Sequence, residues 1–313
     1  METQVLRQPD VHEKSGVTQS ITPFLWFDNQ AEDVANFYTS IFSNSKINVV
    51  THYGTVAERA IGAKSGSIMT VAFQIEGQEF VALNGGPIFK ITPSISFFVN
   101  CSTAQEIDAL WERLSEGGTV MMKLDRYPFS EKYGWIQDKF GVSWQLLLPG
   151  RIQKIAPCLM FAGNQHKKAE EAINFYISVF PNSKIIQLER YTAGQGPEGA
   201  IVHSKFALDG QEFIAMDSHQ ELPYNFNPAV SMVVNCETLE DFDYYWEKLS
   251  EGGDEMAQQC GWLQDKYGVS WQIVPTGWAD IMLDPVKSER AMEAVFQMKK
   301  IDLKTVLRAM EQS

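Results

Sequence analysis

The acidic residue best placed for chemistry is Asp217. It ends the strand-like run Phe213–Asp217, and alternation along a strand turns Phe213, Ala215 and Asp217 to one face. A carboxylate on a buried face must pair, coordinate a cation or lie at a solvated rim, because a buried charge without a partner is costly. Asp217 is therefore the one catalytic candidate that the sequence indicates.

The histidines do not add a metal site to this candidate. His219 lies two residues past Asp217 and could share its rim, but one acid and one imidazole are too few ligands for a metal. His203 alternates onto the face away from Asp217. No serine or cysteine has a histidine and an acid in matching places, so a catalytic triad is not predicted either.

The chain that must position these residues contains an internal sequence repeat. Asn36–Phe42 returns as Asn174–Phe180, and Gly141–Gln145 returns unchanged as Gly268–Gln272. The offset is about the size of one domain, which indicates a duplicated domain. The predicted units are a flexible tail over residues 1–19, a first domain over 20–150, a second domain over 151–278 and a helical tail over 279–313.

Apolar periodicity divides each half into two βαβββ modules. Glu76-Gly77 and Asp209-Gly210 are typical of tight hairpin turns. After Pro285, two amphipathic helices are expected to pack on a domain or another subunit. In the first half we expect strands at 24–27, 47–53, 67–75, 80–83, 94–99, 120–124, 134–138 and 143–148, with helices at 34–42 and 103–116; in the second, helices at 168–180 and 239–251 and strands at 229–234 and 270–274.

The charge composition argues against some classes of binding partner. The net charge of −13 over 313 residues, with no basic run, argues against a nucleic-acid or anionic-membrane surface. No apolar stretch approaches the ~18 residues of a membrane span. The four cysteines form no CxxC pair and are expected to be reduced, so we predict a cytoplasmic protein.

Three segments resemble the PhnB-like branch of the vicinal oxygen chelate superfamily. They are Gly77–Pro87, Gly134–Gln145 and the tail Met292–Leu303. The superfamily includes glyoxalase I, bleomycin-resistance proteins and extradiol dioxygenases. The resemblance implies an α+β fold, a tandem duplication in which the two βαβββ modules of each half form an open eight-stranded cleft, followed by C-terminal helices.

Proteins of this branch often carry the name 3-demethylubiquinone-9 3-methyltransferase. That activity is not expected here, because no strand followed by a Gly-rich loop provides a site for a nucleotide methyl donor.

The resemblance also implies where a metal would be held. Enzymes of the superfamily bind one divalent metal through His or Glu on the first and last strands of the modules. The matching positions are Thr22, Ser94 and Gln145 in the first half and Ala156, Ala229 and Gln272 in the second. None of these side chains is an imidazole or a carboxylate, so we expect no metal and no other cofactor.

Strand alternation from these positions predicts the lining of the two clefts. Phe24 and Trp26 make the first cleft the more aromatic one, and the segment Tyr127–Tyr133, which the second half lacks, is expected to form a lid over it. Trp144 and Trp271 lie one step off the cleft glutamines and should face the helices. The predicted binding residues are Phe24, Trp26, Phe80, Asn84, Ser94, Ser96, Gln145, Met160, Asp217, Ser231 and Gln272.

Three classes of function stay open at this point. The favoured one is metal-independent binding of a small apolar or aromatic molecule, as the bleomycin-resistance relatives hold drugs. The second is a metal-dependent lyase or dioxygenase of the same superfamily, with ligands at other positions. The third is a scaffold whose clefts are collapsed and whose surfaces serve association, a homodimer included.

Overall fold

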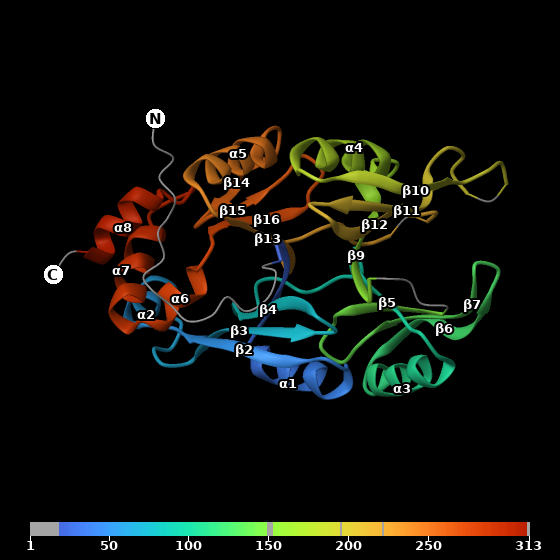
Figure 1. Ribbon diagram of the computed structural model, residues 1–313, viewed down its shortest axis with the longest axis horizontal. Coiled ribbons are helices and arrows are strands. Elements are labelled where there is room, and N and C mark those ends of the chain that lie inside the picture. The colour runs from blue at the N-terminus through green and yellow to red at the C-terminus, as the bar shows by residue number, and fades with distance from the viewer. Residues whose placement is uncertain (1–18, 149–152, 195, 221, 312–313) are drawn as a thin grey trace.

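The computed structural model describes residues 19–148, 153–194, 196–220 and 222–311. Within them, four consecutive modules precede a group of C-terminal helices (Figure 1). Module 1 comprises β1 (Ile21–Phe27), α1 (Ala31–Ile41), β2 (Lys46–His52), α2 (Thr55–Ile61), β3 (Ile68–Ile75) and β4 (Gln78–Asn84). Module 2 comprises β5 (Ile95–Asn100), α3 (Ala104–Ser115), β6 (Thr119–Tyr127), β7 (Ser130–Gln137) and β8 (Ser143–Leu148).

The second half of the chain repeats this order. Module 3 comprises β9 (Ile155–Phe161), the 3-10 turn η1 (Gly163–Gln165), α4 (Ala169–Val179), β10 (Lys184–Arg190), β11 (Ile201–Leu208) and β12 (Gln211–Asp217). Module 4 comprises β13 (Val230–Cys236), α5 (Leu239–Ser250), β14 (Asp254–Gln259), β15 (Trp262–Gln264) and β16 (Ser270–Pro275). The predicted α+β duplication of βαβββ modules is confirmed.

The modules combine into two eight-stranded sheets across the halves of the chain. Sheet A has the strand order β14-β15-β16-β13-β1-β4-β3-β2 and unites modules 4 and 1. Sheet B has the order β10-β11-β12-β9-β5-β8-β7-β6 and unites modules 3 and 2. The central contacts are antiparallel, with Phe24 of β1 opposite Ser231 of β13 and Ser96 of β5 opposite Cys158 of β9.

The expectation that the two modules of each half share one sheet is therefore wrong. All four modules begin with a similar apolar strand, so the sequence pattern does not specify which first strands pair. In the structure β9 pairs with β5 in sheet B, and β13 pairs with β1 in sheet A. The boundaries 20–150 and 151–278 mark the sequence repeat, and as structural domains they stay a prediction.

Each sheet has a helix face and an inner face. Helices α1 and α3 lie along one side of the molecule and α4 and α5 along the other, with the sheets between them (Figure 1). We call the sheet faces that carry these helices the helix faces and the opposite ones the inner faces. A continuous hydrophobic core joins the helix faces of both sheets, and Phe80 of sheet A meets Phe97 of sheet B there with ring centroids 5.1 Å apart.

A buried carboxylate links modules 1 and 2. Asp138, at the turn between β7 and β8, accepts hydrogen bonds from the Tyr38 hydroxyl (2.5 Å) and the Trp144 indole N–H (2.9 Å). Its other oxygen accepts from the backbone N–H groups of Phe140 and Val142. Because Tyr38 belongs to α1 on sheet A and Trp144 to β8 on sheet B, this cluster fastens the two sheets together.

The second half repeats the cluster with Asp265. The Tyr176 hydroxyl and the Trp271 indole N–H donate to the same Asp265 oxygen at 2.7 and 2.8 Å. Trp144 and Trp271 are fully buried on the helix faces, which confirms the side predicted for both. The turns at Glu76-Gly77 and Asp209-Gly210 are also confirmed, since each has two positive φ angles (50° and 81°; 47° and 79°).

Two local features differ from the expectations. Residues 55–61 form helix α2, which was not predicted and to which no helix in the described residues of module 3 corresponds. The segment Tyr127–Tyr133 is not a loop: β6 ends at Tyr127 and β7 begins at Ser130, so it is the tip of a hairpin of sheet B. It therefore belongs to a different sheet from Phe24 and Trp26 and cannot be their lid.

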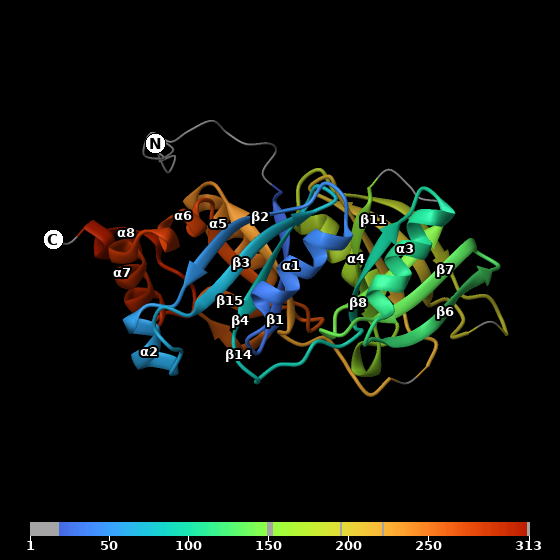
Figure 2. The same cartoon turned by 90° about the horizontal axis from the view of Figure 1, so that it is seen from below.

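The C-terminal helices pack against sheet A, as predicted. They are α6 (Trp278–Leu283), α7 (Pro285–Val295) and α8 (Leu303–Glu311). Helix α6 contacts β2 and α7 contacts α2, while the backbone N–H groups of Cys260 and Gly261 donate to the carbonyls of Met298 and Lys299. These helices form one end of the molecule, and the β6–β7 hairpin lies toward the other (Figures 1 and 2).

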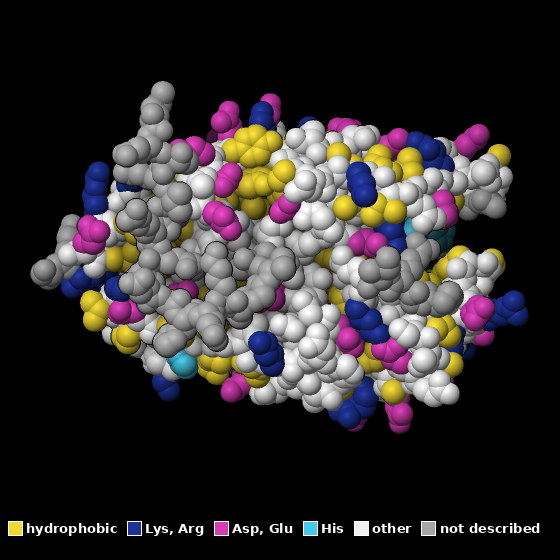
Figure 3. Space-filling view, viewed as in Figure 1, with side chains coloured by type: hydrophobic (Ala, Val, Ile, Leu, Met, Phe, Trp, Pro, Cys, Tyr) yellow, Lys and Arg dark blue, Asp and Glu magenta, His cyan; other side chains and the backbone are white. Residues whose placement is uncertain are grey.

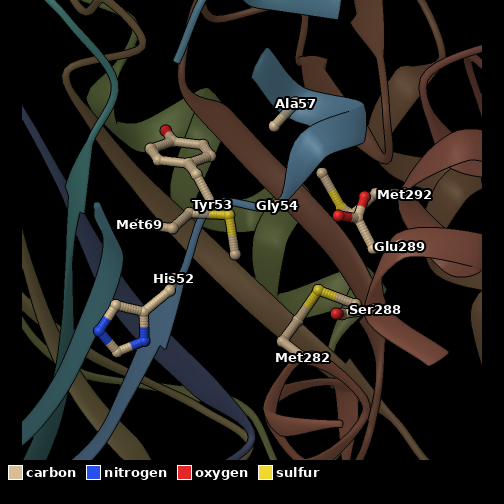
Figure 4. A pocket seen from close by; sticks show the side chains of 9 residues that line it. All are labelled: His52, Tyr53, Gly54, Ala57, Met69, Met282, Ser288, Glu289 and Met292. Atoms are coloured by element: carbon tan, nitrogen blue, oxygen red, sulfur yellow. The ribbon is translucent and has the colours of Figure 1, made fainter. Parts of the chain in front are cut away.

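The seam between α7 and module 1 is closely filled. Met69, Met282 and Met292 converge with Tyr53 and Glu289 around a space of about 10 Å³ (Figure 4), which is room for about one water molecule. This seam is too small for a ligand and serves packing.

Candidate functional site

The inner face of sheet A gathers aromatic rings from both halves of the chain. Trp262 of β15 meets Phe24 and Trp26 of β1 edge-on, with ring centroids 5.7 and 6.0 Å apart. Gln272 lies opposite Trp262 in the ladder, and its side-chain N–H donates to Ser231 Oγ at 3.0 Å. Four predicted residues, Phe24, Trp26, Ser231 and Gln272, are therefore brought together, although they were assigned to two separate clefts.

Trp262 is the functional candidate that the prediction missed. The pair Gly261-Trp262 repeats Gly134-Trp135, but only the pairing of module 4 with module 1 brings it to Trp26. The sequence shows that Trp262 is present, but its contact with Trp26 follows only from the order of strands in sheet A.

The inner face of sheet B carries another group of predicted residues. The Gln145 side-chain N–H donates to Ser96 Oγ at 2.8 Å, and Gln145 Oε1 accepts from the Tyr133 hydroxyl. Ser96 lies opposite Cys158, and Ser94 Oγ lies 2.8 Å from Thr92 Oγ1. Met160 is buried on the same face, next to Ser94 through the hydrogen bond from its backbone N–H to the Ser94 carbonyl.

This second group is filled by its own side chains. Phe98, Tyr133, Ala156, Cys158 and Ile214 form a buried cluster on it. Burial raises the pKa of Cys158 to about 12 and that of Tyr133 well above its usual range, so neither group exchanges a proton near neutral pH. The five side chains of the cluster thus provide no acid or base near neutral pH, and the imidazole of His203 lies beside Phe98, with ring centroids 6.1 Å apart.

Phe80 does not line a cleft, whereas Asn84, at the end of β4, lines a cavity together with Trp26. In the parallel pairing of β4 with β1, Val81 lies beside Phe24 and Leu83 beside Trp26, so Phe80 and Asn84 turn to the helix face. Both alternating sets of β4 mix apolar and polar side chains, so the sequence could not distinguish the two faces, and a shift of one residue exchanged them. Asn84 Oδ1 accepts from the backbone N–H of Ala31 at 2.8 Å, which ties down the start of α1.

Asp217 is the counterpart of Asn84 in the second half, and it lies at the start of α4 as Asn84 lies at the start of α1. Its two carboxylate oxygens accept from the backbone N–H groups of Ala169 (3.2 Å) and Ile201 (2.8 Å). Burial raises the pKa of Asp217, and these hydrogen bonds oppose the rise. The expected place of Asp217 in a cleft is wrong, because its carboxylate holds two backbone segments on the helix face. His203 lies on the opposite face, beside Phe98, as predicted.

A cavity opens where Trp26 reaches the end of sheet A. Its volume is about 590 Å³, and its walls come from the end of β1, the start of α1, the C-terminal end of α2 and the segment after β4. Apolar and aromatic walls are provided by Trp26, Tyr53, Ile61, Ile68 and Ile88. The volume lies in the range of sites for small molecules, and the apolar walls share the lining with polar and acidic residues.

Trp26 is held in one orientation at this cavity. Its indole N–H donates to the Gly86 carbonyl at 2.8 Å, and Phe89 packs edge-on against the ring. A Cβ atom at Gly85 would lie 2.2 Å from the Trp26 ring, so only glycine permits this close approach. The Tyr53 hydroxyl donates to the Asn84 carbonyl at 2.6 Å, and burial raises its pKa to about 12.

The superfamily's metal positions do not fit a metal in this chain. The sheet order regroups them as Thr22, Ala229 and Gln272 on sheet A and as Ser94, Gln145 and Ala156 on sheet B. The Gln145 amide is engaged on both its oxygen and its nitrogen, and hydroxyl and amide groups are weak ligands for transition metals. In the part of the chain that the structure describes, no three His, Cys, Asp or Glu side chains converge as metal ligands.

Burial also makes the thiols poor nucleophiles. All four cysteines are free, and burial raises the pKa of both Cys101 and Cys236 to about 12. No helix in the described residues is long and apolar enough to cross a membrane.

Comparison with known proteins identifies relatives of each half. The family model described as 3-demethylubiquinone-9 3-methyltransferase matches residues 19–147 and again residues 153–274. A PhnB protein of Bacillus cereus is 40% identical over 41% of this chain and 98% of that chain, with a TM-score of 0.38. A protein of Staphylococcus aureus is 33% identical over 43% of this chain and 99% of that chain, with a TM-score of 0.18.

Glyoxalase I of Zea mays matches across the two halves. It covers 82% of this chain and 92% of its own, at 10% identity and a TM-score of 0.53, which shows a shared fold alone. No curated protein matches the chain.

Proposed function

The chain belongs to the family described as 3-demethylubiquinone-9 3-methyltransferase, the PhnB-like branch of the vicinal oxygen chelate superfamily, and we propose that it binds a small apolar or aromatic molecule without a metal. The observation that carries this proposal is the cavity of about 590 Å³ beside Trp26. Its aromatic walls provide contact area and stacking geometry for a ligand ring. Its oriented indole is an anchor that exists before the ligand arrives.

Sheet A is favoured over sheet B for this role. Phe24, Trp26 and Trp262 form a row of rings that leads to the cavity. The corresponding face of sheet B is occupied by the buried cluster around Tyr133 and Cys158. The residues on that face, Ser94, Ser96, Gln145 and Met160, stay predictions as ligand contacts.

Methyl transfer is not part of the proposal. A nucleotide methyl donor needs a strand that runs into a Gly-rich turn and a helix, and the sequence has no such segment. A cytoplasmic location stays a prediction, supported by the four free thiols. A homodimer also stays a prediction.

Calorimetric titration with a neutral aromatic probe, indole-3-ethanol, tests the site. Trp26→Ala should weaken binding by about 1 to 3 kcal/mol, the usual loss for an aromatic anchor. Met160→Ala, on the inner face of sheet B, should change binding little. The reverse order would move the ligand to sheet B, and thermal melts of both variants separate lost binding from lost folding.

Elemental analysis tests the metal-independent part of the proposal. We expect less than stoichiometric Zn, Ni, Mn or Fe in the purified protein, because the superfamily's ligand positions hold neutral side chains. About one metal per cleft, together with activity that a chelator abolishes, would instead support the alternative of a metal-dependent lyase or dioxygenase.

A further inference from the structure

We propose that the cavity beside Trp26 selects a cationic ligand, an aromatic or aliphatic molecule with an ammonium group. This inference rests on the proposed function and specifies the chemical class of its ligand. Three carboxylates, Asp28, Glu32 and Asp33, line the cavity together with the apolar walls, and none of its lining residues is Lys, Arg or His. The cavity thus combines an aromatic surface with uncompensated negative charge.

In the described residues, the side chains of Asp28, Glu32 and Asp33 form no ion pair and no hydrogen bond, and all three are exposed at the cavity. Exposed acids in the first turn of a helix are common, because they interact favourably with the helix dipole. That explanation covers Glu32 and Asp33 in α1, and it applies equally to Glu170 and Glu171 in α4.

The equivalent acids of module 3, Glu170 and Glu171, form ion pairs. In α4, Glu170 pairs with Arg190 at 2.5 Å and Glu171 pairs with Lys168 at 2.8 Å. The first half has the same acids in register, Glu32 and Asp33, but both cationic partners are replaced. Gln30 stands where the second half has Lys168, and His52 stands where it has Arg190. Only the pair of acids beside the cavity is left without the cations that neutralise its copy.

The neighbouring walls suit the rest of such a ligand. Ile61 and Ile88 line the cavity although 58% and 73% of their surfaces are exposed, so an apolar ligand would cover surface that is otherwise in water. The Trp26 ring can hold an ammonium over its face or stack with an aromatic ring. An anionic ligand such as a carboxylate would meet three like charges and no cation.

The experiment compares three probes with one ring and different charges: tryptamine, a cation; indole-3-ethanol, neutral; and indole-3-acetate, an anion. Each is titrated into the full chain by calorimetry at neutral pH and low salt. Tryptamine should bind about tenfold more tightly than indole-3-ethanol, because carboxylates several ångströms away attract its ammonium group across a solvated cavity. Added salt should reduce this ratio of affinities, because it screens the attraction. Indole-3-acetate should bind most weakly.

Matched double variants locate the charge effect. In Glu32→Gln/Asp33→Asn, which leaves Asp28 as the one acid among the cavity's lining residues, the ratio of tryptamine to indole-3-ethanol affinity should fall several-fold toward one, whereas Glu170→Gln/Glu171→Gln should keep the ratio of the unaltered protein. Both variants remove the same helix-dipole interaction, and the control also loses its ion pairs with Lys168 and Arg190, so a general effect on folding should be at least as large in the control.

Each remaining outcome counts against one claim. Equal affinity for tryptamine and indole-3-ethanol, or a preference that is undiminished in Glu32→Gln/Asp33→Asn, overturns the charge inference and leaves the proposed function standing. If the unaltered protein binds none of the three probes, the proposed function fails, and the inference fails with it.

Discussion

The Asp265 carboxylate connects two elements of the second half, α4 and β16, through hydrogen bonds from Tyr176 and Trp271. It accepts hydrogen bonds from Tyr176, Trp271 and two backbone N–H groups, and it is 2% exposed. Burial raises its pKa to about 6, and the hydrogen bonds oppose the rise. Asp138 has the same partners in the first half and its pKa is raised for the same reason.

This raised pKa fixes the sign of a pH effect. Because the folded chain binds the Asp265 proton more tightly than the unfolded chain, whose Asp pKa is about 3.9, the folded state gains stability from protonation. That contribution is fully present below about pH 4 and is lost as the pH rises through about 6. Above about pH 6 the Asp265 carboxylate is negatively charged, and its hydrogen-bond donors stabilise that buried charge.

We therefore expect the cost of Tyr176→Phe to depend on pH. The variant removes one donor from the buried carboxylate, which should lower the free energy of unfolding by about 1 to 3 kcal/mol at pH 8. The cost should be smaller at pH 5, where Asp265 is largely neutral. Urea denaturation at both pH values measures it, with Tyr244→Phe as a control because the Tyr244 hydroxyl donates to a backbone carbonyl instead. An equal loss at both pH values would contradict the raised pKa.

Helix α2 shows how one element depends on another that is distant in sequence. The Glu289 carboxylate of α7 accepts from the backbone N–H groups of Thr55 and Val56 and from the Thr55 hydroxyl. The N-cap residue of α2 is Gly54, which has no side chain to cap the helix, so Glu289 satisfies its first turn from outside. The far end of α2 contributes Ile61 to the cavity wall.

Glu289→Ala should loosen α2 without unfolding the chain. The loss of a cap costs about 1 kcal/mol, and hydrogen exchange of the amides in Thr55–Ile61 should accelerate. Indole-3-ethanol should bind more weakly because one cavity wall is less ordered. Glu293→Ala, an exposed acid on the same helix, is the control. Unchanged exchange in α2 would show that α2 is held by its apolar contacts alone.

The whole molecule is held together by the crossed pairing of its modules. Each sheet takes one module from each half, so neither half contains a complete sheet. Modules 1 and 2 are nevertheless joined through the Tyr38–Asp138–Trp144 cluster on their helix faces. A separated first half would keep that cluster and expose the edges of β1 and β5.

We expect the isolated segment 19–152 to associate into a dimer. In such a dimer, module 1 of one copy would pair with module 2 of the other, which covers the open strand edges. Light scattering after size-exclusion chromatography gives the mass. A folded monomer would mean that the modules of one half can close on each other, as the resemblance to the superfamily first implied.

The sequence by itself determined the features that local pattern controls. The repeats located four βαβββ modules, Glu76-Gly77 set a hairpin turn by its backbone preference, and the spacing between Trp144 and Gln145 placed the tryptophan on the helix face. These features depend on neighbours within a few residues, so periodicity and turn chemistry were sufficient to predict them.

Only the tertiary structure decided which modules share a sheet and which groups meet in the cavity. The first strands are alike, so their pairing depends on links and on contacts far apart in the chain. The face of β4 was undetermined because both sets of its side chains mix apolar and polar residues, and Asp217 was misplaced by the same ambiguity in β12. Trp262 reaches Trp26 and Glu289 reaches α2 only after such long-range pairing, which no local pattern encodes.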